Sequence, residues 1–168
     1  IIKNQVGHVR AERDILTESE NPWIVTLHYS FQDDRNLYMV LEFLPGGDLM
    51  GLLMKEDTFS EEATAFYVAE LVMAVEYVHS LGYIHRDLKP QNVMLTSAED
   101  VQIGDFGLSS ATNARSEVVK TAVGTPMYLS PELVRQFQEA KRGVQGGGYT
   151  SKIDIWSTGC TLLELATL

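Results

Sequence analysis

The 168-residue sequence has few residues that could crosslink the chain or anchor it in a membrane. Its one cysteine, Cys160, rules out an internal disulfide and favours a reducing compartment. We expect the cytoplasm, with the nucleus as the alternative. Cys160 lies in the apolar stretch IWSTGCTLLELA, which is typical of a small core residue. No apolar run approaches the roughly 20 residues of a membrane-spanning helix, and the start of the sequence, IIKNQVGHVR, lacks the apolar core of a secretion signal.

Positive charge is also scarce. Lys and Arg number 13 against 23 Asp and Glu, which gives a formal net charge of −10. This balance argues against nucleic acid or an anionic membrane as the main partner. It would suit a basic substrate, but solubility explains it equally well. Hydrophobic residues make up 45% of the chain, so the composition is that of a globular domain.

The spacing of apolar and turn residues predicts an α+β domain without internal repeats. A small part with strands and one helix precedes a mostly helical part, and the change falls at Pro45–Asp48. Residues 107–129 are rich in turn residues and read as a long loop, a feature that is usually functional. The predicted helices are 7–19, 48–56, 60–80, one from Pro131 and one from about Ser151, and the predicted strands are 23–31, 36–44, 92–96 and 101–104.

Two short motifs carry the chemistry. HRDLKPQN ends at Asn92, and DFG begins at Asp105. Asp87 can accept a proton from a hydroxyl, and Lys89 can reach a transferring phosphate. Asn92 and Asp105 offer the oxygen ligands that Mg²⁺ prefers. Alone, the first motif reads as a charge cluster at a helix end and the second as a turn. Together, in this order and with a strand pair between them, they favour phosphoryl transfer.

On these motifs the sequence resembles the eukaryotic protein kinase family of the Ser/Thr type. The resemblance implies ATP and Mg²⁺ as cofactors and protein substrates with Ser or Thr acceptors. It implies a partial bilobal kinase-like fold, with a small lobe of truncated antiparallel sheet plus helix C. The larger, mostly helical lobe would end in helix F. Residues 1–44 would then be the remnant of the small lobe, and residues 45–168 the hinge and the first part of the large lobe.

The resemblance also implies a nucleotide site. Glu12 matches the helix-C glutamate that pairs with an ATP-anchoring lysine, although alone it reads as a solvated charge. Asp48 matches an acidic position that contacts ribose, and it is equally suited to cap the following helix. Met94 matches the floor of the adenine pocket, with a core methionine as the alternative. The residues implied at the nucleotide site are Glu12, Leu41, Glu42, Leu44, Asp48 and Met94.

Further positions match the end of a kinase activation segment. Thr125, in GTP, would pack beside Asp87 and Lys89, a mark of Ser/Thr specificity. Glu132 matches the glutamate of the family's APE motif, and Asp154 matches the helix-F aspartate that fixes the HRD backbone. The residues to which the resemblance gives structural roles are His85, Phe106, Gly107, Glu132 and Asp154.

Regulation and substrate choice follow from the same resemblance. Thr121 matches an activation-loop phosphosite for an upstream kinase, and we expect Arg86 to bind its phosphate because Arg86 has no obvious counter-ion. The competing sites are Ser109, Ser110 and Ser116. Asp48 and Glu164 favour substrates with basic residues before the acceptor, whereas Gln91 argues against this preference.

Within the family, the first half is most like the NDR branch of the AGC group, without the long NDR insertion. The second half is more like MAP kinase kinase kinases. No glycine-rich G-x-G-x-x-G loop or Val-Ala-Ile-Lys strand precedes Glu12, where Lys3 is the only lysine. We therefore expect an internal fragment of a kinase domain with little activity on its own. The alternative is an inactive kinase-like regulatory or scaffold module, which the intact set Asp87, Lys89, Asn92 and Asp105 disfavours.

Overall fold

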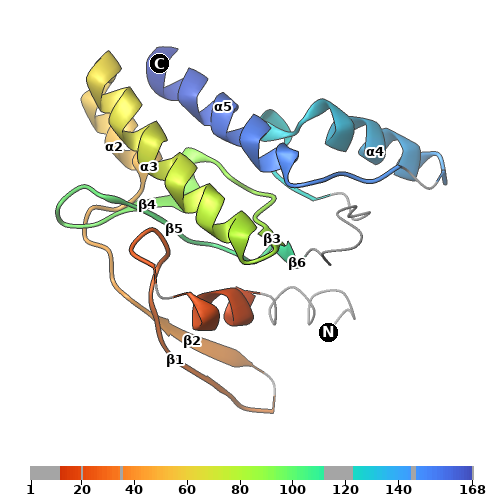
Figure 1. Cartoon of the computed structure of the whole chain (residues 1–168), viewed down its shortest axis with the longest axis horizontal. Coiled ribbons are helices and arrows are strands. Elements are labelled where there is room, and N and C mark those ends of the chain that lie inside the picture. Colours follow the sequence, from red (N-terminus) through yellow and green to blue (C-terminus); the bar gives the residue numbers. More distant parts are fainter. Residues whose placement is uncertain (1–11, 20, 35, 112–122, 145–146, 168) are drawn as a thin grey trace.

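The computed structural model describes residues 12–19, 21–34, 36–111, 123–144 and 147–167, and every structural statement below concerns these residues. They form helices and short antiparallel strands, so the α+β class is confirmed (Figure 1). The predicted helix at 7–19 is described only from residue 12, and residues 12–18 are helical. No helix among the described residues is long and apolar enough to cross a membrane.

The first part of the chain contains an exposed hairpin. β1 (Leu27–Gln32) pairs antiparallel with β2 (Leu37–Leu41), and most residues of both strands are exposed. The strands were predicted at 23–31 and 36–44, so the first begins later than expected. Ile24 instead forms a parallel bridge with Ile103, and Val25 N–H donates to the Ile103 carbonyl at 3.2 Å. Ile24 and Val25 therefore pair with Ile103, which is distant in the sequence, and not with the hairpin to which the β-rich composition assigned them.

Two helices follow, and a side-chain cap starts each of them. Asp48 caps α2 (Leu49–Glu56) by accepting from the Gly51 N–H, and Ser60 caps α3 (Glu61–Ser80) by accepting from the Ala63 N–H. Glu61 and Glu62 lie in the first turn of α3, where the helix dipole favours negative charge. α3 is the long central helix of the molecule (Figure 1).

The catalytic-type motifs lie in short strands and turns beside α3. β4 (Val93–Leu95) and β5 (Val101–Ile103) form one antiparallel pair, close to the predicted strands. β3 (Tyr83–Ile84) pairs with β6 (Ser110–Ala111). This pairing was not predicted, because residues 107–129 were expected to form a loop. The remaining elements are the 3-10 turns η1 (Pro90–Asn92) and η2 (Pro126–Tyr128) and the helices α4 (Pro131–Lys141) and α5 (Lys152–Thr167).

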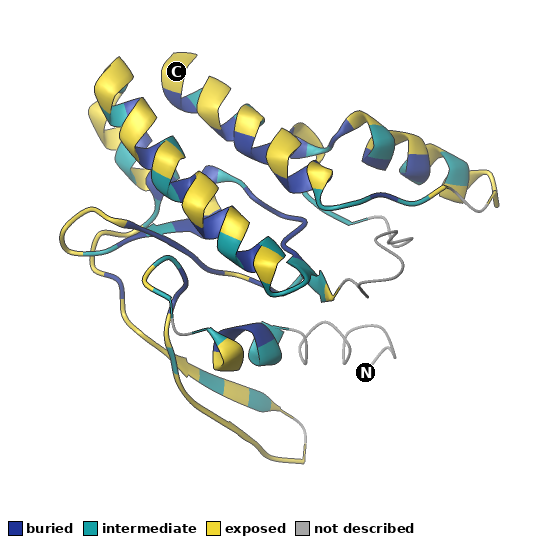
Figure 2. Cartoon of the chain, viewed as in Figure 1, coloured by how far each residue is buried: buried dark blue, intermediate teal, exposed yellow. Residues whose placement is uncertain are grey.

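The main core surrounds one face of α3, and the opposite face is open to solvent (Figure 2). Leu71, Val75 and Val78 are buried in this face, and they pack in one cluster with Phe106 and Leu165. A second, smaller cluster joins the start of α4 to the start of α5. Its buried members are Ile84, Leu133, Tyr149 and Ile153. Between the two clusters lies the segment that carries HRDLKPQN.

Candidate active site

The segment from His85 to Asn92 is fixed by a buried carboxylate on α5. Asp154 is fully buried, and its Oδ2 accepts the His85 N–H at 2.9 Å while its Oδ1 accepts the Arg86 N–H at 2.9 Å. His79, in the last turn of α3, places its Nε2 2.8 Å from the same Oδ2. Asp154 thus joins two helices to the backbone of the candidate catalytic segment, in the position that the resemblance gave it.

Asp87 is the centre of the candidate site, and donors occupy both of its oxygens. Oδ2 accepts from Lys89 Nζ at 2.8 Å and from Asn92 Nδ2 at 3.2 Å. Oδ1 accepts from the Thr125 backbone N–H at 3.0 Å and from the Thr125 hydroxyl at 2.5 Å. Lys89 Nζ also donates to Thr125 Oγ1 at 2.9 Å. Four residues spread over 39 positions of the sequence therefore meet at one carboxylate.

Asn92 and Asp105 lie at the same end of the β4–β5 pair. Asn92 immediately precedes β4, Asp105 follows β5 by two residues, and the Gly104 N–H donates to the Asn92 carbonyl at 3.1 Å. The Asn92 Nδ2 group donates to the Asp87 carbonyl at 2.9 Å, which leaves the amide oxygen as an available ligand. One amide oxygen and one exposed carboxylate suit Mg²⁺, which keeps several waters and phosphate oxygens in its shell. The donor set therefore fits the implied metal.

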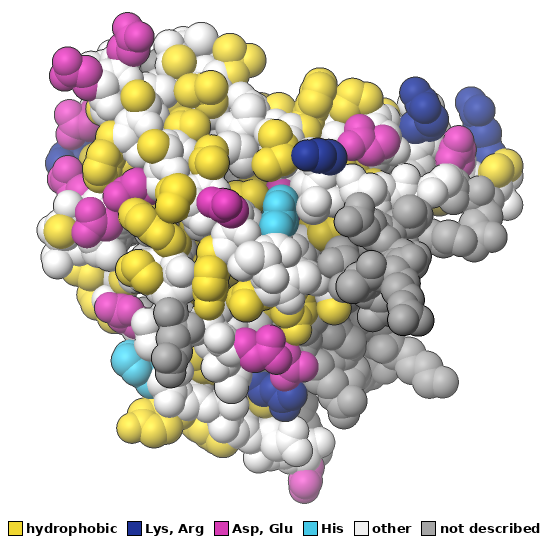
Figure 3. All heavy atoms as spheres, viewed as in Figure 1, with side chains coloured by type: hydrophobic (Ala, Val, Ile, Leu, Met, Phe, Trp, Pro, Cys, Tyr) yellow, Lys and Arg dark blue, Asp and Glu magenta, His cyan; other side chains and the backbone are white. Residues whose placement is uncertain are grey.

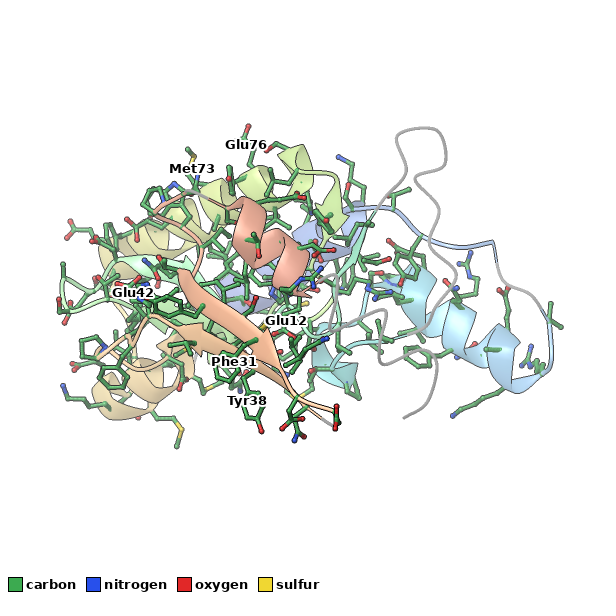
Figure 4. All side chains as sticks on the ribbon, turned by 90° about the horizontal axis from the view of Figure 1, so that it is seen from below. Glu12, Phe31, Tyr38, Glu42, Met73 and Glu76 are labelled. Atoms are coloured by element: carbon green, nitrogen blue, oxygen red, sulfur yellow. The ribbon has the colours of Figure 1, made fainter. Side chains whose placement is uncertain are left out.

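Glu12 lies beside the DFG turn. A Cβ atom placed on Gly107 would lie 3.2 Å from Asp105 Oδ1 and 3.8 Å from Glu12 Oε2. Burial, and then the charge of Asp105, raise the pKa of Glu12. Figure 4 shows Glu12 towards the middle of the molecule, with Phe31 and Tyr38 stacked on the hairpin. Among the described residues, no Lys or Arg forms an ion pair with Glu12.

The residues implied at the nucleotide site are only partly brought together. Asp48 and Met94 form an isolated antiparallel bridge, and the Gly46 N–H donates to the Leu95 carbonyl at 3.1 Å. Leu44 is buried, whereas Leu41 and Glu42 are exposed on the side of the hairpin. A cavity of about 520 Å³ lies between α2 and residues 95–99 and includes Asp48. The other implied nucleotide residues do not line this cavity.

The residues with implied structural roles differ in their surroundings. His85 is buried against Phe106, with ring centroids 4.9 Å apart, and its Nε2 lies 3.1 Å from the Gly104 carbonyl. Burial lowers the pKa of His85 despite the nearby Asp154. Glu132, in the first turn of α4, is half-buried, and no cation in the described ranges forms an ion pair with it. Its partial exposure makes an unpaired carboxylate there less costly than a buried one.

Arg86 forms no ion pair among the described residues, but its donors have neutral partners that were not predicted. Its guanidinium is buried and donates from Nε to the Leu108 carbonyl at 2.5 Å and from Nη2 to the Ser109 carbonyl at 3.0 Å. Nη1 donates to the Tyr149 hydroxyl at 3.0 Å. Neutral oxygens therefore hold the charge and tie it to the residues after DFG. Thr121 and Ser116 lie outside the described residues.

Sequence reasoning missed several residues that build this site. His79 and Tyr149 carry no motif signal, because their partners Asp154 and Arg86 are more than 60 positions away. Tyr128 was also missed. It is buried, and its hydroxyl donates to Glu164 Oε2 at 2.5 Å. Burial, and then this hydrogen bond, raise the pKa of Tyr128 well above its ordinary range.

Comparison with known proteins identifies the family of the chain. The model of the protein kinase domain matches residues 1–168, so the chain belongs to the protein kinase family. The kinase-like α+β fold expected from the sequence is thereby confirmed. The chain is 40% identical over 198 residues to serine/threonine-protein kinase sax-1 of Caenorhabditis elegans, covering 97% of this chain and 40% of the relative.

Two further relatives bear similar names. Serine/threonine-protein kinase CBK1 of Pneumocystis carinii is 38% identical over 209 residues, which cover 96% of this chain and 39% of the relative. Serine/threonine-protein kinase tricornered of Drosophila melanogaster is 38% identical over 205 residues, which cover 97% of this chain and 42% of the relative. The chain thus spans about 40% of the length of these relatives. They bear out the predicted resemblance to the NDR branch of the AGC group.

Proposed function

We propose that this chain carries the phosphoryl-transfer site of a serine/threonine protein kinase, which moves the γ-phosphoryl group of ATP to a Ser or Thr hydroxyl of a protein substrate. The observation that carries the proposal is the cluster at Asp87, where Lys89, Asn92 and Thr125 all donate to one carboxylate. Phosphoryl transfer needs chiefly positioning and charge compensation, and these are what such a cluster supplies.

In the proposed mechanism, Asp87 orients the acceptor hydroxyl and takes its proton as the hydroxyl oxygen bonds to phosphorus. Thr125 holds Oδ1 of Asp87, and Asn92 holds Oδ2, so the carboxylate cannot turn away from the acceptor. Lys89 lies 2.8 Å from the same carboxylate and is placed to offset negative charge on the transferring group.

We assign Asn92 and Asp105 as the protein ligands of Mg²⁺, which supplies charge neutralisation at the phosphates when it is bound. The geometry that supports the assignment is their position at one end of the β4–β5 pair. The residues that the resemblance implies at the nucleotide site remain a prediction: Glu12, Leu41, Glu42, Leu44, Asp48 and Met94. The bridge between Asp48 and Met94 supports the part of this site that faces α2.

For the 168-residue chain on its own, we propose little transfer activity. The support is Glu12, whose carboxylate faces Asp105 and has no cation partner in the part of the chain that the structure describes. Two neighbouring carboxylates repel each other, and nothing described here ties Glu12 to a phosphate. The relatives are named serine/threonine-protein kinases, and this chain spans about two fifths of their length, so their names support the proposed activity only for a protein that includes the rest of such a kinase.

The test is phosphoryl transfer from labelled ATP to a Ser/Thr peptide by the full-length protein. Asp87→Asn and Asp105→Asn should each lower turnover at saturating ATP and Mg²⁺ by about 10²–10⁴-fold. The matched control is Asp57→Asn, which makes the same change at an exposed helix end where φ is 68°. Asn tolerates that conformation, so the control should keep its activity. Near-normal turnover of either site variant, with the fold intact, would contradict the assignment.

We also propose that phosphorylation of Thr121 by an upstream kinase regulates the site through Arg86. Three of the guanidinium N–H groups donate to Leu108, Ser109 and Tyr149, and the other two have no hydrogen-bond partner among the described residues and could donate to a phosphate. Thr121→Ala and Arg86→Ala should each lower activity in the full-length protein, and the double variant should be little worse than either. Losses that simply add would show that Thr121 acts elsewhere.

Substrate choice and location are proposals of the same kind. Asp48 and Glu164 support a preference for Arg or Lys before the acceptor. Among the described residues, one oxygen of each carboxylate accepts a hydrogen bond, from the Gly51 N–H or from the Tyr128 hydroxyl, and the other oxygen has no hydrogen-bond partner and could bind a substrate cation. The single cysteine supports a cytoplasmic location, with the nucleus as the alternative.

A further inference from the structure

Four exposed cations lie together on α4 and at the start of α5, outside the candidate active site. They are Arg135, Lys141, Arg142 and Lys152, called the α4 basic face below. Among the described residues, none of the four forms an ion pair with a carboxylate. Unpaired cations are unexpected in a chain with a formal net charge of −10, where acidic partners are plentiful.

Helical spacing aligns the cations of α4. Arg135 and the C-cap residue Arg142 are seven residues apart, so they lie on the same side of α4, about 10 Å apart along its axis, with the half-buried Glu139 between them. Lys141 follows Val134 by the same interval and continues this exposed side. Leu133 is buried on the opposite side.

The second core cluster brings Lys152 to the same region. Leu133, on α4, and Ile153, on α5, are buried in one cluster. Lys152 precedes Ile153 and is exposed, so its ammonium group extends the charge from the first half of α4 onto the start of α5.

Local helix energetics explain only part of this arrangement. Lys141 lies in the last turn of α4, where the helix dipole favours a cation. Arg135 lies in the middle of α4, where the dipole has little effect. Lys152 is the first residue of α5, where the positive end of the dipole disfavours it. Lys152 therefore lies where the dipole of its own helix makes a cation unfavourable.

The charges of the molecule are separated between its ends. In the face shown in Figure 3, Lys and Arg side chains lie along the α4 end with acidic side chains among them, since α4 also carries Glu132 and Glu139, whereas Asp and Glu dominate the α2–α3 end. The overall negative charge repels long polyanions such as nucleic acid and anionic membranes, but a short acidic segment needs to meet only the local field. Two exposed apolar side chains, Val134 at 40% and Val144 at 55%, flank the cations and offer apolar contact to the same segment.

We propose that the α4 basic face docks an acidic polypeptide segment of a partner protein, with apolar side chains among its Asp and Glu residues. The cations supply attraction and orientation, and Val134 and Val144 supply apolar area. The inference does not depend on the proposed kinase activity, because none of these residues contacts Asp87 or its donors.

The test measures binding of a fluorescein-labelled EELEELEE peptide to the full chain by fluorescence anisotropy. Arg135→Gln and Arg142→Gln should each weaken binding about two- to fivefold, and rising salt should weaken it further. Lys55→Gln is the matched control, since it removes one exposed cation from α2. It should leave affinity unchanged. Gln is a good helix former, and circular dichroism should show the same helix content in all variants.

Several results would overturn the proposal. One is an equal loss of affinity in Lys55→Gln, which would show a response to net charge alone. Another is equal binding of a peptide with Gln in place of Glu. A third is that the peptide does not bind, whereas heparin or phosphatidylserine vesicles bind through Arg135 and Arg142. The α4 basic face would then belong to a different class of partner. Hydrogen exchange gives an independent readout, because bound peptide should slow exchange at residues 134–144 and not in α2.

Discussion

Asp154→Ala tests how strongly α5 fixes the candidate catalytic segment. The side chain of Asp154 is fully buried and accepts three hydrogen bonds, from His79 Nε2 and from the backbone N–H groups of His85 and Arg86. Alanine offers no acceptor in its place. His85 and Arg86 are themselves buried, so water does not readily replace the lost carboxylate.

The magnitude follows from those three contacts. A buried donor left without a partner costs about 1–3 kcal/mol, and the two backbone N–H groups lose the same acceptor together. The His79 side chain is 19% exposed and can turn towards water, so its loss costs less. We expect Asp154→Ala to lower the free energy of unfolding by about 3–5 kcal/mol, the range for removing one partner of a buried charged contact.

Urea unfolding of the chain, followed by the fluorescence of its two tryptophans, measures this loss. The matched control is Thr158→Val on the same helix, where a similarly buried hydroxyl donates only to the Asp154 carbonyl at 2.8 Å. It should cost about 1 kcal/mol. If Asp154→Ala stays within about 1 kcal/mol of the wild type, or Thr158→Val costs as much, the carboxylate is not the support we describe.

Two other predictions concern single contacts. Burial and Asp105 raise the pKa of Glu12 above 4.5, so its ionised form destabilises the fold at neutral pH. Glu12→Gln should therefore raise the midpoint of urea unfolding at pH 7, and this gain in stability should vanish as the pH falls below 4.5. A variant that is less stable than the wild type at pH 7 would contradict the prediction. A Cβ at Gly46 would lie 2.5 Å from the Thr96 carbonyl oxygen, so Gly46→Ala should destabilise the chain by about 1–3 kcal/mol in the same assay. Gly51→Ala is the control, because that helical position has room and should gain about 0.5–1 kcal/mol.

Local signals predicted the elements that local chemistry controls. Asp48 was suited to cap the helix that follows it and accepts the Gly51 N–H, and Ser60, at the predicted start of the next helix, accepts the Ala63 N–H. Burial on α3 depends less on local chemistry, because Val72 follows the buried Leu71 and is 47% exposed. Helical spacing gives the width of an apolar face only approximately, and the neighbours of α3 decide which edge of that face is covered.

Residues whose partners are far away in the sequence were predicted only where a motif named both partners. Thr125 meets Asp87 across 38 positions, as the family resemblance implied. Arg86 has equally distant partners, but no motif specifies Tyr149 or the carbonyls that follow DFG. Charge reasoning therefore found no counter-ion for Arg86 and named no other partner. It counted only opposite charges, whereas a buried guanidinium can satisfy its donors with neutral oxygens.

The backbone of the site gives a physical reason why its motifs depend on one another. Arg86 and Asp105 both have positive φ angles, of 73° and 54°, which cost of order 1 kcal/mol or more for residues other than glycine. Such conformations persist only where surrounding contacts hold them. Asp154 accepts the Arg86 N–H, and the Arg86 guanidinium bonds to Leu108 and Ser109, just beyond Asp105. The side chain of one strained residue thus anchors the segment that carries the other, so the catalytic segment and the DFG turn are held as one unit rather than as two separate turns.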